Sequence, residues 1–126
     1  AGASRKYAHL LDGIELADSW ATDGHKWLNV GYDCGVLLTR HAEPLRKAMS
    51  APAAYLMETG HQDSSAPDSS RRARCFEVWA ALRSLGRQGL EELVDRCCRH
   101  AAHFARELRV AGVEIPHDVV LNQVLA

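Results

Sequence analysis

The clearest hydrophobic pattern of this 126-residue sequence lies between residues 90 and 109. Apolar side chains recur there at intervals of three and four residues, which places them on one face of an α-helix. Glutamates begin the segment and arginines end it, as the helix dipole favours, and Gly112 follows as a stop signal. The pattern predicts a long amphipathic helix whose apolar face is formed by Leu90, Leu93, Val94, Cys97, Cys98, Ala101, Phe104 and Leu108.

A shorter helix is predicted just upstream, over residues 71–85. Val78, Leu82 and Leu85 fall on one face of it, as the helical period requires. Polar residues at positions 68 to 70 are suitable caps for its start, and Gly86 ends it.

The remaining apolar runs are short and typical of strands. The run GVLLTR (35–40) predicts a buried strand, and a short helix is predicted after it over 41–50. Two more strands are predicted at 113–115 and 119–126, while the polar residues 58–72 predict a long loop. Helices and strands alternate along the chain, so the predicted fold class is α/β.

Composition excludes several classes of function. The chain has 15 Lys and Arg against 16 Asp and Glu, a formal net charge of −1, so nothing indicates a general affinity for nucleic acid or an anionic membrane. The sequence has no apolar run of membrane-spanning length and no signal-peptide pattern. Its four cysteines form neither a CxxC pair nor a disulfide framework, which favours a cytoplasmic protein with reduced thiols.

The two ends of the sequence are unusual for a complete domain. The sequence starts at Ala1 without a methionine and stops within the apolar run 119–126. A strand needs a paired neighbour to satisfy its backbone groups. We therefore expect this chain to be a piece of a longer polypeptide and to be marginally folded by itself.

Two clusters of polar residues are candidates for binding sites. His100 and His103 have a helical spacing that can hold a metal ion, but no third ligand is in view, so a solvated helix face is preferred and no metal is predicted. Arg71, Arg72 and Arg74 lie at a predicted helix N-terminus, where the dipole disfavours positive charge. A bound phosphate, a carboxylate or an acidic partner surface would favour them, and a solvated charge run is the alternative.

Lys26 is the candidate nucleophile, placed between His25 and Trp27 ahead of an apolar run. A free lysine is protonated at neutral pH and is therefore a poor nucleophile. An imine-forming lysine needs desolvation or nearby positive groups, which the two ring side chains and the following strand could supply. Spacing alone leaves open the alternative of a surface lysine.

The segment ADSWATDGHKWLNVGYDCGVLLTR (17–40) resembles the active-site segment of the group II pyridoxal-phosphate-dependent amino-acid decarboxylases. The family hallmark is an acidic or polar residue, a His-Lys pair, an apolar stretch and then DCG or DCS. Three further segments resemble the family. The helix that leads to the family's C-terminal domain is matched by SRRARCFEVWAALRSLGRQGLEELV (70–94), and the start of its mobile loop by YLMETG (55–60). The first strands of the C-terminal domain are matched by DVVLNQVLA (118–126). These blocks occur in the family's order over almost the whole chain. The hallmark is met here by Asp23, His25, Lys26, Trp27, Asp33, Cys34 and Gly35.

This resemblance implies a fold, a cofactor and a site. The fold is type I of the pyridoxal-phosphate-dependent transferases, as in aspartate aminotransferase, with residues 1–86 as the C-terminal part of the large cofactor-binding domain and residues 87–126 as the truncated beginning of the small C-terminal domain. Lys26 would be the catalytic residue and form the Schiff base with pyridoxal 5'-phosphate, while His25 would contact the cofactor phosphate. The substrate would be an amino acid, and the full-length protein would be a homodimer with the arginine cluster as a structural or inter-subunit feature near the site.

The resemblance also leaves functions open. The family aspartate that faces the pyridine nitrogen lies upstream of the lysine, and no aspartate of this sequence matches its motif, so we expect this chain alone to be inactive. A different fold type I pyridoxal-phosphate lyase or desulfurase is one alternative, because those enzymes also use a His-Lys pair. A non-catalytic remnant, or an interaction module built on the 90–109 helix, is the other alternative.

Overall fold

The computed structural model describes residues 1–49, 66 and 70–126. These residues group into two compact units. One unit runs from Glu15 to Val78 and contains the His-Lys pair, whereas the other joins Ala1–Ile14 to Trp79–Ala126. The predicted domain boundary after residue 86 is not tested by this grouping and stays a prediction.

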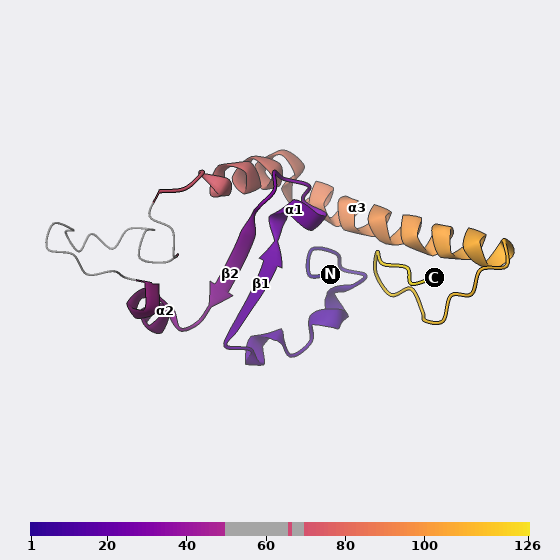
Figure 1. Cartoon of the computed structure of the whole chain (residues 1–126), viewed down its shortest axis with the longest axis horizontal. Helices are drawn as coiled ribbons and strands as arrows, with labels where there is room; N and C mark the ends of the chain where they lie inside the picture. Colours follow the sequence, from indigo (N-terminus) through magenta and orange to yellow (C-terminus); the bar gives the residue numbers. More distant parts are fainter. Residues whose placement is uncertain (50–65, 67–69) are drawn as a thin grey trace, which may run out of the picture. The chain divides into compact units, whose positions relative to one another are not determined.

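An antiparallel pair of strands forms the centre of the continuous unit (Figure 1). Strand β1 (Ser19–Asp23) pairs with β2 (Gly35–Thr39) along its whole length, with Asp23 opposite Gly35. The connection between the strands contains the short helix α1 (Gly24–Trp27), which follows β1 directly. The His-Lys pair is therefore located at one end of a hairpin.

The strand predicted at 35–40 is confirmed by β2, but the prediction that it is buried is wrong. Leu37 and Leu38 are 53% and 41% exposed. Within the described residues the sheet has two strands, so β2 lacks the covering layers that bury a central strand. β1 was not predicted, because its sequence SWATD has no regular alternation of apolar and polar residues.

Helix α2 (Ala42–Met49) follows β2 and confirms the short helix predicted at 41–50. Pro44 lies in its first turn, where the amide that proline lacks has no helical partner anyway. The predicted loop at 58–72 lies largely outside the described residues, and the YLMETG segment at 55–60 lies entirely outside them.

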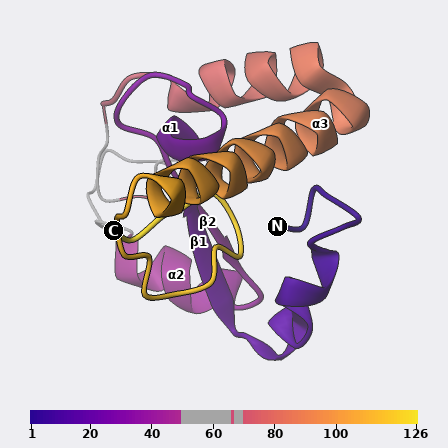
Figure 2. The ribbon, with the colours of Figure 1, turned by 90° about the vertical axis from the view of Figure 1, so that its right-hand side faces the viewer.

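Helix α3 (Arg74–Val110) contains both helices predicted in this region. Gly86 interrupts it with φ 61° and ψ −175°, and the chain turns there between two helical parts (Figure 2). Such a conformation is accessible to glycine at little cost and strained for other residues. The predicted helix end at Gly86 is confirmed, and the second part resumes directly after it. No helix in the described residues combines the length and the hydropathy that a membrane span needs.

The second part of α3 buries a narrow face. The buried residues are spaced by four, three and four positions, as expected for one side of a helix. Phe104, which was predicted on this face, is instead 56% exposed, and the neighbouring alanine takes the buried position. The buried residues are Val94, Cys98, Ala101 and Ala105.

The end of α3 is a Schellman motif, as the predicted stop at Gly112 requires. The N–H of Val113 donates to the carbonyl of Leu108 (2.9 Å), and the N–H of Gly112 donates to that of Arg109 (3.1 Å). Gly112 has φ 84°, which glycine adopts readily. The strands predicted beyond it, at 113–115 and 119–126, are wrong: these residues form no strand, because no neighbouring strand of the described chain offers them hydrogen bonds.

The N-terminal segment belongs to the same unit as this part of α3. It contains the short 3₁₀ helices η1 (Ala8–Leu11) and η2 (Ile14–Leu16), of which the second extends into the other unit. Ser4 is fully buried, and its hydroxyl donates to Asp95 Oδ1 at 2.6 Å. Arg5 adds a backbone hydrogen bond and an ion pair to Glu91.

Candidate active site

Gly24 makes the turn from β1 into the His-Lys pair possible. Its N–H donates to the carbonyl of Cys34 at 2.8 Å, which continues the strand pairing by one step. A Cβ at Gly24 would lie 3.1–3.3 Å from side-chain atoms of Val30, Cys34 and Val78. The close approach favours glycine here, because any larger side chain would press on these three neighbours.

Lys26 is exposed and paired with Asp23. Its Nζ lies 2.6 Å from Asp23 Oδ2, and the two side chains are 67% and 37% exposed. The hydrogen bond from Lys26 lowers the pKa of Asp23, and the same hydrogen bond raises the pKa of Lys26. Lys26 is therefore held in its protonated form, in a solvated setting.

His25 is oriented by the backbone of Cys34. Its Nδ1 lies 3.0 Å from the Cys34 nitrogen and 3.2 Å from the Cys34 oxygen. The N–H of Cys34 donates to Nδ1, whereas the Cys34 oxygen already accepts the N–H of Gly24 and needs no second donor. Cys34 is 2% exposed, and leaving its amide unpaired would cost about 1–3 kcal/mol. These contacts assign the proton of the neutral imidazole to Nε2, which is then a hydrogen-bond donor.

Tyr32 contacts the ring of His25. The ring centroids are 4.5 Å apart and the planes are inclined by 54°, a tilted arrangement common between aromatic rings. Sequence reasoning missed both this contact and the backbone contact of Cys34. Both depend on how the loop between β1 and β2 folds back, which residue spacing does not reveal.

The arginines at the start of α3 bind the same loop. Arg74 Nε donates to Asp33 O (2.9 Å) and Oδ1 (3.0 Å), and its Nη2 lies 2.9 Å from Oδ1. The hydrogen bond from Arg74 lowers the pKa of Asp33. Arg72 Nη2 donates to the Gly31 carbonyl (3.3 Å) and lies 3.5 Å from Glu77 Oε2. A phosphate, a carboxylate, an acidic partner surface or solvent alone was expected beside this cluster. The structure places carboxylates beside these two arginines, those of Asp33 and Glu77.

The histidine pair on the long helix does not form a metal site in the described residues. His103 Nδ1 lies 2.7 Å from Arg106 Nη2 and 3.4 Å from Glu107 Oε1. No group of three or more His, Cys, Asp or Glu side chains suited to a metal ion occurs in the part of the chain that is described.

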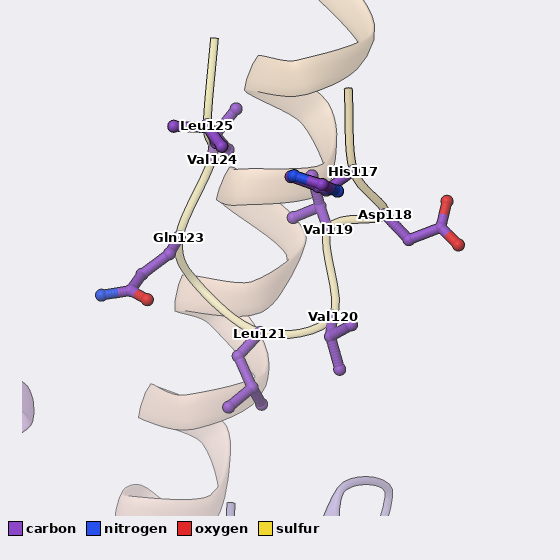
Figure 3. Close-up of a pocket in the computed structure, with 8 residues that line it drawn as sticks. All are labelled: His117, Asp118, Val119, Val120, Leu121, Gln123, Val124 and Leu125. Atoms are coloured by element: carbon purple, nitrogen blue, oxygen red, sulfur yellow. The ribbon is translucent and has the colours of Figure 1, made fainter. Parts of the chain in front are cut away.

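A hollow of about 600 Å³ lies in the C-terminal segment (Figure 3). Its lining residues all come from positions 117–125 and are mainly apolar. In Figure 3 the carboxylate of Asp118 and the amide of Gln123 point away from each other, on opposite sides. The hollow contains no residue of the predicted site, and we assign it no role.

The chain resembles known decarboxylases in sequence. The family model described as the pyridoxal-dependent decarboxylase conserved domain matches residues 1–125. The acidic amino acid decarboxylase of Mus musculus is 35% identical over 114 residues, which are 84% of this chain and 21% of that protein. The aromatic-L-amino-acid decarboxylase of Drosophila lebanonensis is 33% identical over 107 residues, which are 79% of this chain and 26% of that protein.

Solved structures agree with the sequence matches. Mouse CSAD in its apo form has a TM-score of 0.82 and 28% identity, over 97% of this chain and 26% of that chain. The 4-hydroxyphenylacetaldehyde synthase of Rhodiola rosea has a TM-score of 0.73 and 28% identity, over 96% and 25%. The chain thus spans about a quarter of the length of these relatives. The predicted class is confirmed as an α/β portion of the fold type I architecture, and the chain belongs to the pyridoxal-dependent decarboxylase family.

Proposed function

We propose that the whole protein is a pyridoxal 5'-phosphate-dependent amino-acid decarboxylase, a carboxy-lyase, in which Lys26 holds the cofactor and His25 contacts its phosphate. The observation that carries this proposal is the orientation of His25 directly beside Lys26. The N–H of Cys34 occupies Nδ1 and leaves Nε2–H as a donor, and phosphate oxygens are strong acceptors for such a group. The family match and the two decarboxylase relatives support the reaction class.

The residues of the loop fit the cofactor at two points. Lys26 supplies the primary amine that attaches it covalently, and His25 supplies the donor that holds its phosphate. When bound, pyridoxal 5'-phosphate supplies an electron sink for the electron pair left by departing carbon dioxide. The roles of Lys26 and His25 are thus attachment and orientation.

Lys26 must lose a proton before its amine can act as a nucleophile. In the described structure its ammonium is paired with Asp23 and is largely solvated. Both features favour the charged form. Lys26 is therefore a weak nucleophile in this chain at neutral pH. We expect the 126-residue chain by itself to show no decarboxylation, because no aspartate of this sequence matches the family aspartate that faces the pyridine nitrogen.

The proposed substrate is an amino acid, in line with the names of the two relatives. We propose that the full-length protein is a homodimer, as the family resemblance implies. A cytoplasmic location is supported by the four cysteines, which are all free thiols.

A different reaction on the same cofactor is favoured by one observation. One of the similar structures is named a 4-hydroxyphenylacetaldehyde synthase, so its named product is an aldehyde. Product analysis must therefore separate an amine from an aldehyde.

The test of the site is a titration of this chain with pyridoxal 5'-phosphate, followed by borohydride reduction and peptide mapping. We expect the label on Lys26 in preference to Lys6 and Lys47. The preference should exceed that seen with pyridoxal, which lacks the phosphate. Lys26→Ala should remove the main label, and the matched variant Lys47→Ala should retain it. Equal labelling of all lysines, or no labelling, contradicts the proposed site.

The test of the activity uses the full-length protein and a panel of amino acids. Release of carbon dioxide together with the corresponding amine supports the decarboxylase. Formation of an aldehyde supports the alternative reaction on the same cofactor and contradicts the proposed one. Absence of both products contradicts both reactions and leaves the other two alternatives, a different fold type I lyase or desulfurase and a non-catalytic remnant.

A further inference from the structure

Arg74 binds both oxygen atoms that Asp33 presents to it. Its Nε donates to the main-chain oxygen and to Oδ1, and its Nη2 reaches the same Oδ1. A planar guanidinium that binds main chain and side chain together fixes the orientation of a residue as well as its place. Arg74 therefore holds Asp33 more rigidly than a single ion pair could.

The main-chain oxygen bound by Arg74 belongs to the same peptide group as the N–H of Cys34. A peptide group is planar, so its oxygen and its N–H cannot turn independently. Arg74 Nε donates to the oxygen of this group at 2.9 Å, and the nitrogen of the group donates to His25 Nδ1 at 3.0 Å. A hydrogen-bond chain thus runs from Arg74 through the peptide to His25, and such chains strengthen their members by polarisation.

We propose that Arg74 is a positioning residue, which holds the peptide between Asp33 and Cys34 so that its N–H binds His25 Nδ1 and Nε2–H is presented to a phosphate. The inference rests on the proposed function for its last step, the phosphate contact. Its first step, the fixed tautomer of His25, concerns this chain without any cofactor.

The first step is tested by nuclear magnetic resonance on the chain labelled with ¹⁵N-histidine, at mildly alkaline pH and without cofactor. Long-range ¹H–¹⁵N correlations distinguish a protonated ring nitrogen from an unprotonated one, and His25→Gln assigns the signals. We expect one tautomer in the wild-type chain, with the proton on Nε2. Arg74→Gln should give a mixture of tautomers, and Arg74→Lys should restore part of the preference because lysine can still donate to Asp33.

A matched control is Arg83→Gln, which removes an exposed arginine from the same helix. It should leave the tautomer unchanged. Circular dichroism checks that each variant keeps its helix, and if Arg74→Gln unfolds, Arg74→Lys decides. An unchanged single tautomer in the folded Arg74 variants overturns the proposal.

The second step is tested by the ratio of Lys26 labelling by pyridoxal 5'-phosphate to labelling by pyridoxal. At metal sites, loss of a residue that orients a ligand costs about 10–100-fold in affinity or activity. By the same reasoning Arg74→Gln should lower this ratio about tenfold, toward that of His25→Gln. No preference for the phosphate in the wild-type chain contradicts the proposed function. A wild-type preference that Arg74→Gln leaves intact contradicts the role of Arg74, so the two failures are distinguishable.

Discussion

Asp23 and Lys26 hold opposite charges 2.6 Å apart, and this pair sets the reactivity of the lysine. The pKa of Lys26 is raised in the folded chain. The stabilisation of the folded state by the pair is therefore complete below the ordinary lysine pKa, and it is lost as the pH rises through the raised value. The pKa of Asp23 is lowered in the folded chain. The same stabilisation is therefore complete above the ordinary aspartate pKa, and it is lost as the pH falls through the lowered value. Lys26 is protonated across the neutral range in any case, and the pair extends this range to higher pH.

Asp23→Asn should therefore make Lys26 more reactive at mildly alkaline pH. Each unit by which the pKa falls raises the free-amine fraction about tenfold below the pKa. We expect the pH–rate profile of Lys26 acylation, followed by peptide mass spectrometry, to move to lower pH. The control is Glu43→Gln, which removes the carboxylate 3.9 Å from Lys47 and should leave Lys26 unaffected. Identical profiles for Asp23→Asn and the wild-type chain would show that the ion pair does not govern the lysine.

Gly24 supports the site through the space it leaves for others. Gly24→Ala would place a methyl group 3.1–3.3 Å from atoms of Val30, Cys34 and Val78, so overpacking should lower the free energy of unfolding by about 1–3 kcal/mol. Gly35→Ala is the matched control, because the nearest atom to its added Cβ is Asp23 Oδ1 at 3.8 Å. Urea unfolding followed by circular dichroism compares the two. Equal midpoints for both variants would contradict the tight packing at Gly24.

At the scale of elements, the two glycines near the bend of α3 should respond to alanine with opposite signs. Gly86 has φ 61° and open space around it, so Gly86→Ala meets backbone strain of about 1–3 kcal/mol rather than a clash. Gly89 is helical and its added Cβ makes an ordinary 3.4 Å contact with Leu85, so Gly89→Ala should gain about 1 kcal/mol of helix propensity. Thermal unfolding measures both. A gain for Gly86→Ala would indicate that α3 straightens there without penalty.

The elements that were predicted from sequence are those specified by local signals. Gly86 and Gly112 mark helix ends by backbone preference alone, and Val94, Cys98 and Ala101 follow the helical period. The predicted strands at 113–115 and 119–126 failed because a strand depends on a partner elsewhere, which local pattern cannot supply.

In the site, the His-Lys pair was identified from its motif, whereas the contact of Arg74 with Asp33 joins residues 41 positions apart. No spacing rule connects such residues, although their opposite charges are compatible with the contact.

At the scale of the whole chain, contacts between distant positions assemble the discontinuous unit. Ser4 and Asp95 are 91 positions apart, and Arg5 and Glu91 are 86 apart. Ordering the intervening chain costs conformational entropy that grows slowly with its length. The hydrogen bonds that join the N-terminal segment to α3 must offset part of that cost.

Ser4→Ala tests this assembly, because it removes one buried hydroxyl and nothing else. Ser4 is fully buried, and its loss leaves Asp95 Oδ1 without the donor at 2.6 Å. We expect the free energy of unfolding to fall by about 1–3 kcal/mol, measured by urea unfolding with circular dichroism. The control is Ser84→Ala, at an exposed position of α3. It removes no buried hydrogen bond and should not lower the stability, since alanine is a slightly better helix former than serine. If both variants unfold at the same urea concentration, the hydrogen bond of Ser4 does not stabilise the unit.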